Sequence, residues 1–159
     1  MAESLTWFLA NRIPKPHTIM KILYTTEATA TGGREGSAKT ADGVLDVQLS
    51  TPKEMGGSGG PGTNPEQLFA CGYSACFLGA IRYVAGKSKI HIPAEATVTG
   101  KVSFGARDDE QGFGLQVELV IKVPGLDKGT VQSLVDQADV VCPYSHATRN
   151  NIKVTLTVA

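Results

Sequence analysis

The feature that most constrains the fold of this chain is one long apolar segment, PEQLFACGYSACFLGAIRYVAG, which begins at Pro65. Asn64 is a favourable N-cap, Pro65 suits the first helical position, and Glu66 lies in the first turn, where the helix dipole favours an acid. The segment predicts a helix that runs to about Val84 and is closed by Gly86. Because it is apolar on most faces and carries small residues where other backbone must approach, we expect a central, buried helix.

β patterns precede this helix. Residues 21–28 are rich in β-forming side chains, and residues 37–40 and 44–49 flank Asp42 and Gly43, a pair typical of hairpin turns. We therefore expect three short strands in the first third of the chain, followed by a glycine-rich surface loop before the helix begins.

The part of the chain after the helix has both periodicities. Residues 94–104 and 114–123 alternate between polar and apolar side chains, which predicts an antiparallel pair with one polar face. Residues 126–141 carry a helical apolar stripe that Pro143 stops, and residues 150–158 read as a final strand.

Strands and helices are thus segregated in the order βββ-α-ββ-α-β, which predicts an α+β fold with antiparallel sheets and the long central helix packed on them. The length of 159 residues is that of one domain. We assign it to residues 20–159 and treat residues 1–19 as an N-terminal extension, because a strand pattern begins directly after Met20. The extension lacks the features of a secretory signal, and no membrane span is expected, so the predicted location is cytoplasmic.

Charge and cysteine content narrow the class of function. The 15 basic and 15 acidic residues give a formal net charge of zero, which argues against nucleic acid or another polyanion as a partner. Three cysteines are an odd number in a chain that is large enough to fold without disulfides. They predict free thiols in a reducing compartment.

A dinucleotide fingerprint is matched formally by Gly57, Gly59 and Gly62. These glycines lie in a long loop, and the surrounding strand pattern is antiparallel, so the required strand–turn–helix context is missing. We interpret the segment as a flexible loop and predict no cofactor.

A zinc site of the Cys3His type can be assembled on paper from Cys71, Cys76, Cys142 and His146. Five residues on a helix turn Cys71 and Cys76 roughly 140° apart, so at most one of them shares a site with Cys142. A zinc protein therefore stays a minor alternative, and no metal is predicted. Cys71 fits a packing role in the helix, whereas Cys142 lies at a helix end where its side chain can be presented.

Two stretches of the chain, GGREGSAKTADGVLDVQLSTPKEMGGSGGPGTNPEQLFACGYSACF and VCPYSHATRNNIKV, resemble the organic hydroperoxide resistance proteins, the thiol peroxidase branch of the Ohr/OsmC family. The resemblance implies that Cys76, in SACF, attacks the peroxide and that Cys142, in VCPYS, is the resolving thiol. It assigns Arg34, in GGR, and Glu66, in NPEQ, to the same site. Cys71 departs from the family pattern and is expected to be a spectator.

The chemistry implied by this resemblance is a peroxidase cycle. Arg34 stabilises the thiolate and the developing alkoxide, and Glu66 orients the guanidinium. Cys76 becomes a sulfenic acid and then condenses with Cys142 to a disulfide. The resemblance also implies an intertwined homodimer of OsmC-like fold, and recycling by dihydrolipoyl groups. Apolar neighbours of Cys76 in the sequence, namely Tyr73, Phe69, Phe77 and Leu78, favour an alkyl or fatty-acyl hydroperoxide as substrate.

Helix geometry restricts how these residues assemble. On one unbroken helix, Glu66 and Cys76 are separated by roughly 15 Å along the axis and about 80° in azimuth. Either the helix is broken near Gly72, or Glu66 serves the site of a second chain, and we predict a homodimer with composite sites. A non-enzymatic redox sensor or binding module of the same fold remains the alternative from another functional class, and the osmotically inducible branch is a third reading.

Overall fold

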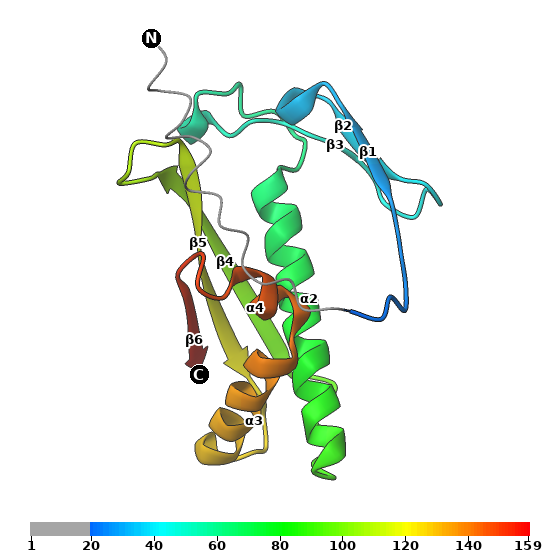
Figure 1. Ribbon diagram of the computed structural model, residues 1–159, viewed down its shortest axis with the longest axis vertical. Coiled ribbons are helices and arrows are strands. Elements are labelled where there is room, and N and C mark those ends of the chain that lie inside the picture. Colours follow the sequence, from blue (N-terminus) through cyan, green and yellow to red (C-terminus); the bar gives the residue numbers. More distant parts are fainter. Residues whose placement is uncertain (1–19) are drawn as a thin grey trace.

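The computed structural model describes residues 20–159, and Figure 1 shows an α+β arrangement of two small sheets and one long helix. The predicted extension, residues 1–19, lies outside the described residues. The order of the predicted elements is confirmed, with one further helix that the sequence did not indicate.

The first sheet is antiparallel and has the order β1-β2-β3. Strands β2 (Ser37–Thr40) and β3 (Asp46–Gln48) form the predicted hairpin, and the carboxylate of Asp42 accepts hydrogen bonds from the hydroxyl of Thr40 and the backbone N–H of Val44. Strand β1 (Ala28–Thr31) begins later than predicted. Its four residues pair with β2, and residues 20–27 form no strand because they find no strand partner among residues 20–159.

The long helix α2 (Pro65–Lys87) is the predicted one, and it continues without a break to a C-cap at Ser88. The side chain of Asn64 caps it by accepting a hydrogen bond from the backbone N–H of Gln67 at 2.9 Å. Before it lie two short 3-10 helices, η1 (Gly33–Glu35) and η2 (Lys53–Met55).

One face of α2 is buried and the opposite face is exposed. The buried residues are Tyr73, Phe77, Ala80, Ile81, Val84 and Ala85. The face that carries Cys71, Ala75 and Gly79 is open in the single chain, because the second sheet and α3 cover the helix from one side only. Within residues 20–159, α2 is long and apolar enough to cross a membrane by length and composition alone; its buried face, however, packs as the core helix of a folded domain.

The second sheet has the order β4-β5-β6. Strands β4 (Thr97–Ala106) and β5 (Phe113–Lys122) are the predicted antiparallel pair. The prediction of purely antiparallel pairing is wrong for β6 (Val154–Val158), which pairs parallel to β5. The helices between β5 and β6 cross over the sheet and return the chain toward the end of the sheet at which β5 begins, as a parallel connection requires.

Two helices form this crossover. Helix α3 (Lys128–Val141) is capped by the side chain of Asp127 and ends before Pro143, as predicted. Pro143 also begins a further short helix, α4 (Pro143–Thr148), which lies across the middle of α2 in Figure 1. Cys142 is therefore the joint between α3 and α4.

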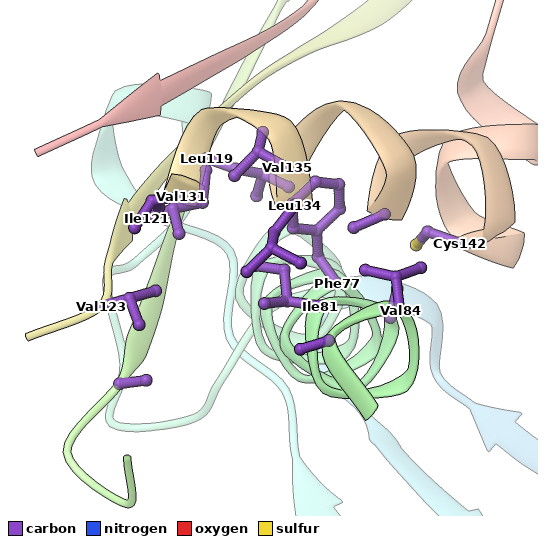
Figure 2. Close-up of a cluster of buried hydrophobic side chains, with 14 of the residues drawn as sticks. Phe77, Ile81, Val84, Leu119, Ile121, Val123, Val131, Leu134, Val135 and Cys142 are labelled. Atoms are coloured by element: carbon purple, nitrogen blue, oxygen red, sulfur yellow. The ribbon is translucent and has the colours of Figure 1, made fainter. Parts of the chain in front are cut away.

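The core lies between α2, α3 and the second sheet (Figure 2). Its largest buried apolar contributions include Phe77 and Ile81 from α2, Leu119 and Ile121 from β5, and Leu134 from α3. Among the described residues, none from β1, β2 or β3 belongs to this core, and all of β1 is exposed. The first sheet thus has no apolar layer of its own. In Figure 1 it extends away from the second sheet and α3.

Candidate active site

The thiols of Cys76 and Cys142 lie in contact. Their Sγ atoms are 3.6 Å apart, although the two residues are 66 positions apart in the chain. Cys142 is fully buried at the α3–α4 joint, and Cys76, on α2, is partly exposed. A disulfide needs an S–S distance of about 2.05 Å, so a small movement of either side chain is sufficient to form one. The pair combines an accessible thiol with a protected second thiol.

The surroundings of Cys76 in the single chain favour its protonated form. Burial raises the pKa of the Cys76 thiol, a hydrogen bond from the backbone of Tyr144 lowers it, and the neighbouring Cys142 raises it further. No side-chain cation contributes to this balance among the described residues. Only the thiolate is a good nucleophile, so Cys76 needs a nearby positive charge that lowers its pKa, and the described residues of one chain do not supply it.

Arg34 and Glu66 form a second pair, through a bidentate ion pair. Nη1 of Arg34 donates to Oε2 of Glu66 at 2.8 Å, and Nη2 donates to Oε1 at 2.7 Å. The hydrogen bond from Arg34 is the main cause that lowers the pKa of the Glu66 carboxyl, and the same bond raises the pKa of Arg34. The fork geometry holds the guanidinium in one orientation.

A glycine turn presents Arg34. Gly32 and Gly33 have φ angles of 71° and 58°, in a region that residues other than glycine rarely adopt. A Cβ atom at Gly36 would lie 1.8 Å from the carbonyl oxygen of Thr31, so the turn closes tightly on both sides of η1. The GGREG motif therefore fixes the direction in which Arg34 leaves the backbone.

An apolar pocket lies beside the Arg34–Glu66 pair. It has a volume of about 320 Å³ and is lined by Arg34, Pro65, Glu66, Phe69, Phe104, Phe113, Gly114 and Leu115. The guanidinium carbon of Arg34 lies 5.4 Å from the ring centre of Phe104, and that ring stacks on Phe113 at 4.8 Å. The pocket thus offers an apolar wall next to a fixed positive charge.

The aromatic residues predicted to surround Cys76 divide between two locations. Tyr73 and Phe77 are fully buried in the core, while Phe69 lines the pocket beside Arg34. Sequence reasoning missed Phe104 and Phe113. They meet only through the register of β4 and β5, in which Phe104 pairs with Leu115, and Phe113 with Ala106, so that the two rings approach along a diagonal.

The two pairs do not meet within one chain. The alternative in which the helix is broken near Gly72 is wrong, because α2 is continuous from Pro65 to Lys87. Gly72 has a packing role: a Cβ atom there would lie 3.0 Å from the hydroxyl oxygen of Tyr144. Glu66 and Cys76 therefore keep the separation of roughly 15 Å that ten helical residues give.

The remaining candidates are also located. Cys71 is exposed on α2, so its predicted packing role is wrong within the single chain. Because α2 is continuous, Cys71 and Cys76 keep the angular separation of roughly 140° that five helical residues give. His146 is exposed on α4. Within residues 20–159, no group of three or more His, Cys, Asp or Glu side chains is placed so that it could hold a metal ion.

The Arg34–Glu66 pair predicts a pH-dependent contribution to stability. The pKa of Glu66 is lower in the folded chain than in the unfolded chain. The ionised Glu66 therefore stabilises the fold above the unfolded pKa, and this stabilisation is lost as the pH falls through the folded pKa. We expect Glu66→Gln to lower the free energy of unfolding by about 1 kcal/mol or less at pH 7, because Arg34 is 37% exposed. The difference from the wild type should vanish near pH 3 in urea unfolding.

The matched control for this prediction is Glu95→Gln, at an exposed acid away from the pair. That variant should follow the wild type at both pH values. A Glu66→Gln deficit that stays constant down to pH 3 would contradict the assignment to the ion pair.

Comparison with known proteins gives a consistent set of similarities. The family model described as OsmC-like protein matches residues 56–157. The organic hydroperoxide resistance protein of Xanthomonas axonopodis pv. citri is 58% identical over 139 residues, which are 87% of this chain and 96% of that protein. The crystal structure of an organic hydroperoxide resistance protein from Legionella pneumophila has a TM-score of 0.82 and 48% identity, and covers 87% of this chain and 99% of its own. The structure of OhrB from Bacillus subtilis has a TM-score of 0.80 and 43% identity, with 87% and 100% covered.

Proposed function

Because the chain belongs to the organic hydroperoxide resistance proteins of the OsmC-like family, we propose that it is a cysteine-based peroxidase that reduces organic hydroperoxides to alcohols. The observation that carries the proposal is the 3.6 Å contact between a partly exposed thiol, Cys76, and a buried thiol, Cys142. This is the arrangement needed for attack on a substrate by one thiol and rapid resolution by the other.

The proposed cycle balances as a two-electron exchange. The Cys76 thiolate attacks one oxygen of the hydroperoxide, the O–O bond breaks, and the alkoxide leaves as the alcohol after taking up a proton, so that Cys76 becomes a sulfenic acid. The Cys142 thiol then attacks that sulfur, a disulfide forms, and water leaves. An external dithiol, such as a dihydrolipoyl group, returns both thiols by exchange and is itself oxidised to a disulfide.

Arg34 and Glu66 act in this proposal across a homodimer. The guanidinium of Arg34 from one protomer stabilises the thiolate and the developing alkoxide at Cys76 of the other protomer, and Glu66 keeps it oriented. Support comes from the unbroken helix, which separates Glu66 from Cys76, and from the raised pKa of the Cys76 thiol in the single chain. A partner's guanidinium supplies the missing positive charge.

The surfaces left open by the single chain support an intertwined dimer. The face of α2 with Cys71, Ala75 and Gly79 is exposed and has small side chains that permit close approach of a second helix. The first sheet has no core of its own, and the exposed residues that precede it include Met20, Ile22, Leu23 and Tyr24. A second copy covers these apolar surfaces at once.

The pocket beside Arg34 supports an organic substrate. Phe69, Phe104, Phe113 and Leu115 give it an apolar wall, so an alkyl or fatty-acyl tail gains binding energy there that hydrogen peroxide cannot gain. The free thiols and the dithiol reductant suit a reducing compartment, which agrees with the predicted cytoplasmic location.

The test is a count of free thiols by mass spectrometry before and after one equivalent of cumene hydroperoxide. We expect two of the three thiols to be lost, a peptide link between Cys76 and Cys142, and Cys71 still a free thiol when the denatured protein is alkylated. Steady consumption with dihydrolipoamide distinguishes a peroxidase from a sensor, which reacts once. Thiols that remain free, or a link that uses Cys71, would contradict the proposal.

A further inference from the structure

We infer that a network of three hydroxyl groups, from Tyr73, Ser145 and Thr148, holds Cys142 within reach of Cys76. The inference rests on the proposed function. It adds that this hydroxyl network determines whether the Cys76 sulfenic acid is resolved to a disulfide or oxidised further. Tyr73 is a positioning residue in this role, because it acts through Cys142.

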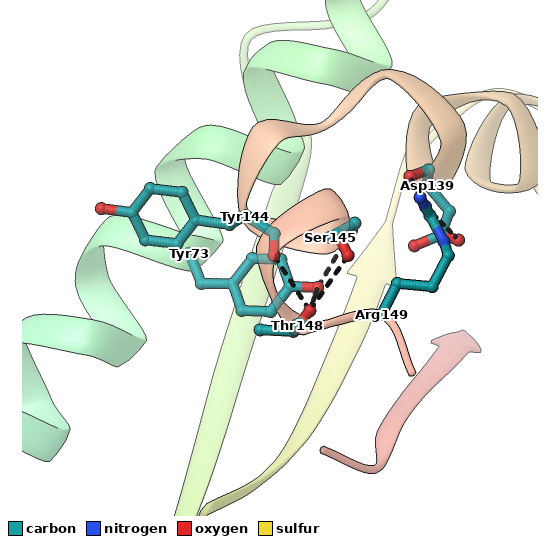
Figure 3. A network of polar contacts seen from close by, with 6 residues as sticks. All are labelled: Tyr73, Asp139, Tyr144, Ser145, Thr148 and Arg149. Carbon is teal, nitrogen blue, oxygen red and sulfur yellow. Dashed lines mark hydrogen bonds and ion pairs between the residues drawn. The ribbon is translucent and has the colours of Figure 1, made fainter. Parts of the chain in front are cut away.

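The hydroxyl network lies about one helical turn from the thiol pair along both α2 and α4. Tyr73 precedes Cys76 by three residues on α2, and Ser145 follows Cys142 by three residues in α4. The Tyr73 Oη and Ser145 Oγ atoms are 2.9 Å apart, and Tyr73 Oη is 3.3 Å from Thr148 Oγ1 (Figure 3). Residues three apart on a helix share a face, so the hydroxyl contact and the thiol contact join the same two helices.

Each hydroxyl group in the network can donate once. Thr148 Oγ1 lies 2.9 Å from the carbonyl oxygen of Tyr144 and donates to it. Tyr73 can then donate to Thr148 and accept from Ser145, which leaves no member without a partner. Tyr73 is fully buried, and Ser145 and Thr148 are 2% and 6% exposed. All the bonds of this network join protein groups to one another, so the loss of one hydroxyl group affects the whole contact.

The position of α4 fixes the position of the Cys142 thiol. Cys142 is the joint from which α4 begins, and its backbone N–H donates to Ala138 of α3 at 2.9 Å. A cavity of about 220 Å³ borders Tyr73, Ser145 and Thr148 and is also lined by Val154 and Leu156 of β6. Once the Tyr73–Ser145 bond is removed, this space lets α4 shift relative to α2, and the Sγ atoms then spend less time in contact.

Two reactions compete for the Cys76 sulfenic acid. Condensation with Cys142 is first order and depends on how often the two sulfur atoms meet; it forms a disulfide and releases water. Attack on a second hydroperoxide is second order, forms a sulfinic acid and releases a second alcohol. A looser α4 slows the first reaction most, because condensation needs contact between the two sulfur atoms. The initial attack by Cys76 depends on α4 only through the backbone hydrogen bond of Tyr144.

The test is Tyr73→Phe, which keeps the ring and its packing against Phe69, Phe77 and Tyr144 and removes only the hydroxyl group. We expect the single-turnover rate of disulfide formation to fall about three- to ten-fold, with the sulfinic acid fraction at Cys76 rising in proportion. The rate at which the first equivalent of cumene hydroperoxide is consumed should change by less than about two-fold. Both products are measured by mass spectrometry after quenching.

Tyr83→Phe is the matched control, because it removes an exposed hydroxyl group from the same helix and should behave as the wild type. Ser145→Ala breaks the same bond from α4 and serves if Tyr73→Phe does not fold. An unchanged ratio of disulfide to sulfinic acid, or an equal loss of attack and resolution, would overturn the inference. The wild-type arm reports separately on the proposed function: a wild type that forms no Cys76–Cys142 disulfide overturns that function itself.

Discussion

Cys76→Ser should lower the rate of organic hydroperoxide consumption by more than about 10³-fold, because a serine hydroxyl stays protonated at neutral pH and is a far weaker nucleophile than a thiolate. The substitution changes one atom at a partly exposed position of α2, so the fold and the dimer should persist. The measurement is loss of cumene hydroperoxide with dihydrolipoamide as reductant, with circular dichroism as a check on the fold.

The chain supplies its own matched controls for this result. Cys71→Ser makes the same change on the exposed face of the same helix and should retain full activity. Cys142→Ser should still react with the first equivalent, because the attacking thiol is intact, and should then accumulate sulfinic acid at Cys76. Full turnover by Cys76→Ser, or a loss of activity in Cys71→Ser equal to that of Cys76→Ser, would contradict the roles proposed for these thiols.

Much of the fold follows from local sequence signals. Asn64 and Pro65 fixed the start of α2 because capping needs only neighbouring residues, and the alternation in β4 and β5 is equally local. Residues 20–27 have strand composition and form no strand, because pairing depends on a partner strand that their own sequence does not contain. The sequence does not indicate helix α4, because Pro143 reads as a helix stop, although proline also suits the first position of a new helix.

The sequence predicts the candidate site as a set of residues and says less about their arrangement in space. The motifs assigned Cys76, Cys142, Arg34 and Glu66, and helix geometry alone indicated that Glu66 and Cys76 cannot meet on one helix. Which pairs form within the chain depends on tertiary packing, which motifs do not encode. Tyr73 illustrates the limit: in an apolar helix pattern it reads as a core ring, and its hydroxyl role appears only when α4 is placed against α2.

The proposed composite site makes a second prediction with a large effect, and it concerns the chain that supplies Arg34. Arg34→Ala should lower peroxidase activity by about 10²- to 10³-fold, as expected for the loss of a group that stabilises developing negative charge. It should also raise the pKa of the Cys76 thiol, since burial already raises it and the guanidinium is the proposed counterweight. Titration of Cys76 alkylation against pH measures that shift, and Lys39→Ala, on β2 outside the pocket, serves as the control.

Co-expression of Arg34→Ala and Cys76→Ser chains then separates a site within one chain from a site between two. In a composite site, the Cys76 of the Arg34→Ala chain meets the Arg34 of the Cys76→Ser chain, so each mixed dimer has one complete site. Random pairing makes half of the dimers mixed, with one of two sites complete, and should restore about a quarter of wild-type activity. If Arg34 instead served Cys76 of its own chain, every site would lack one of the two groups and the mixture would stay as inactive as its parents.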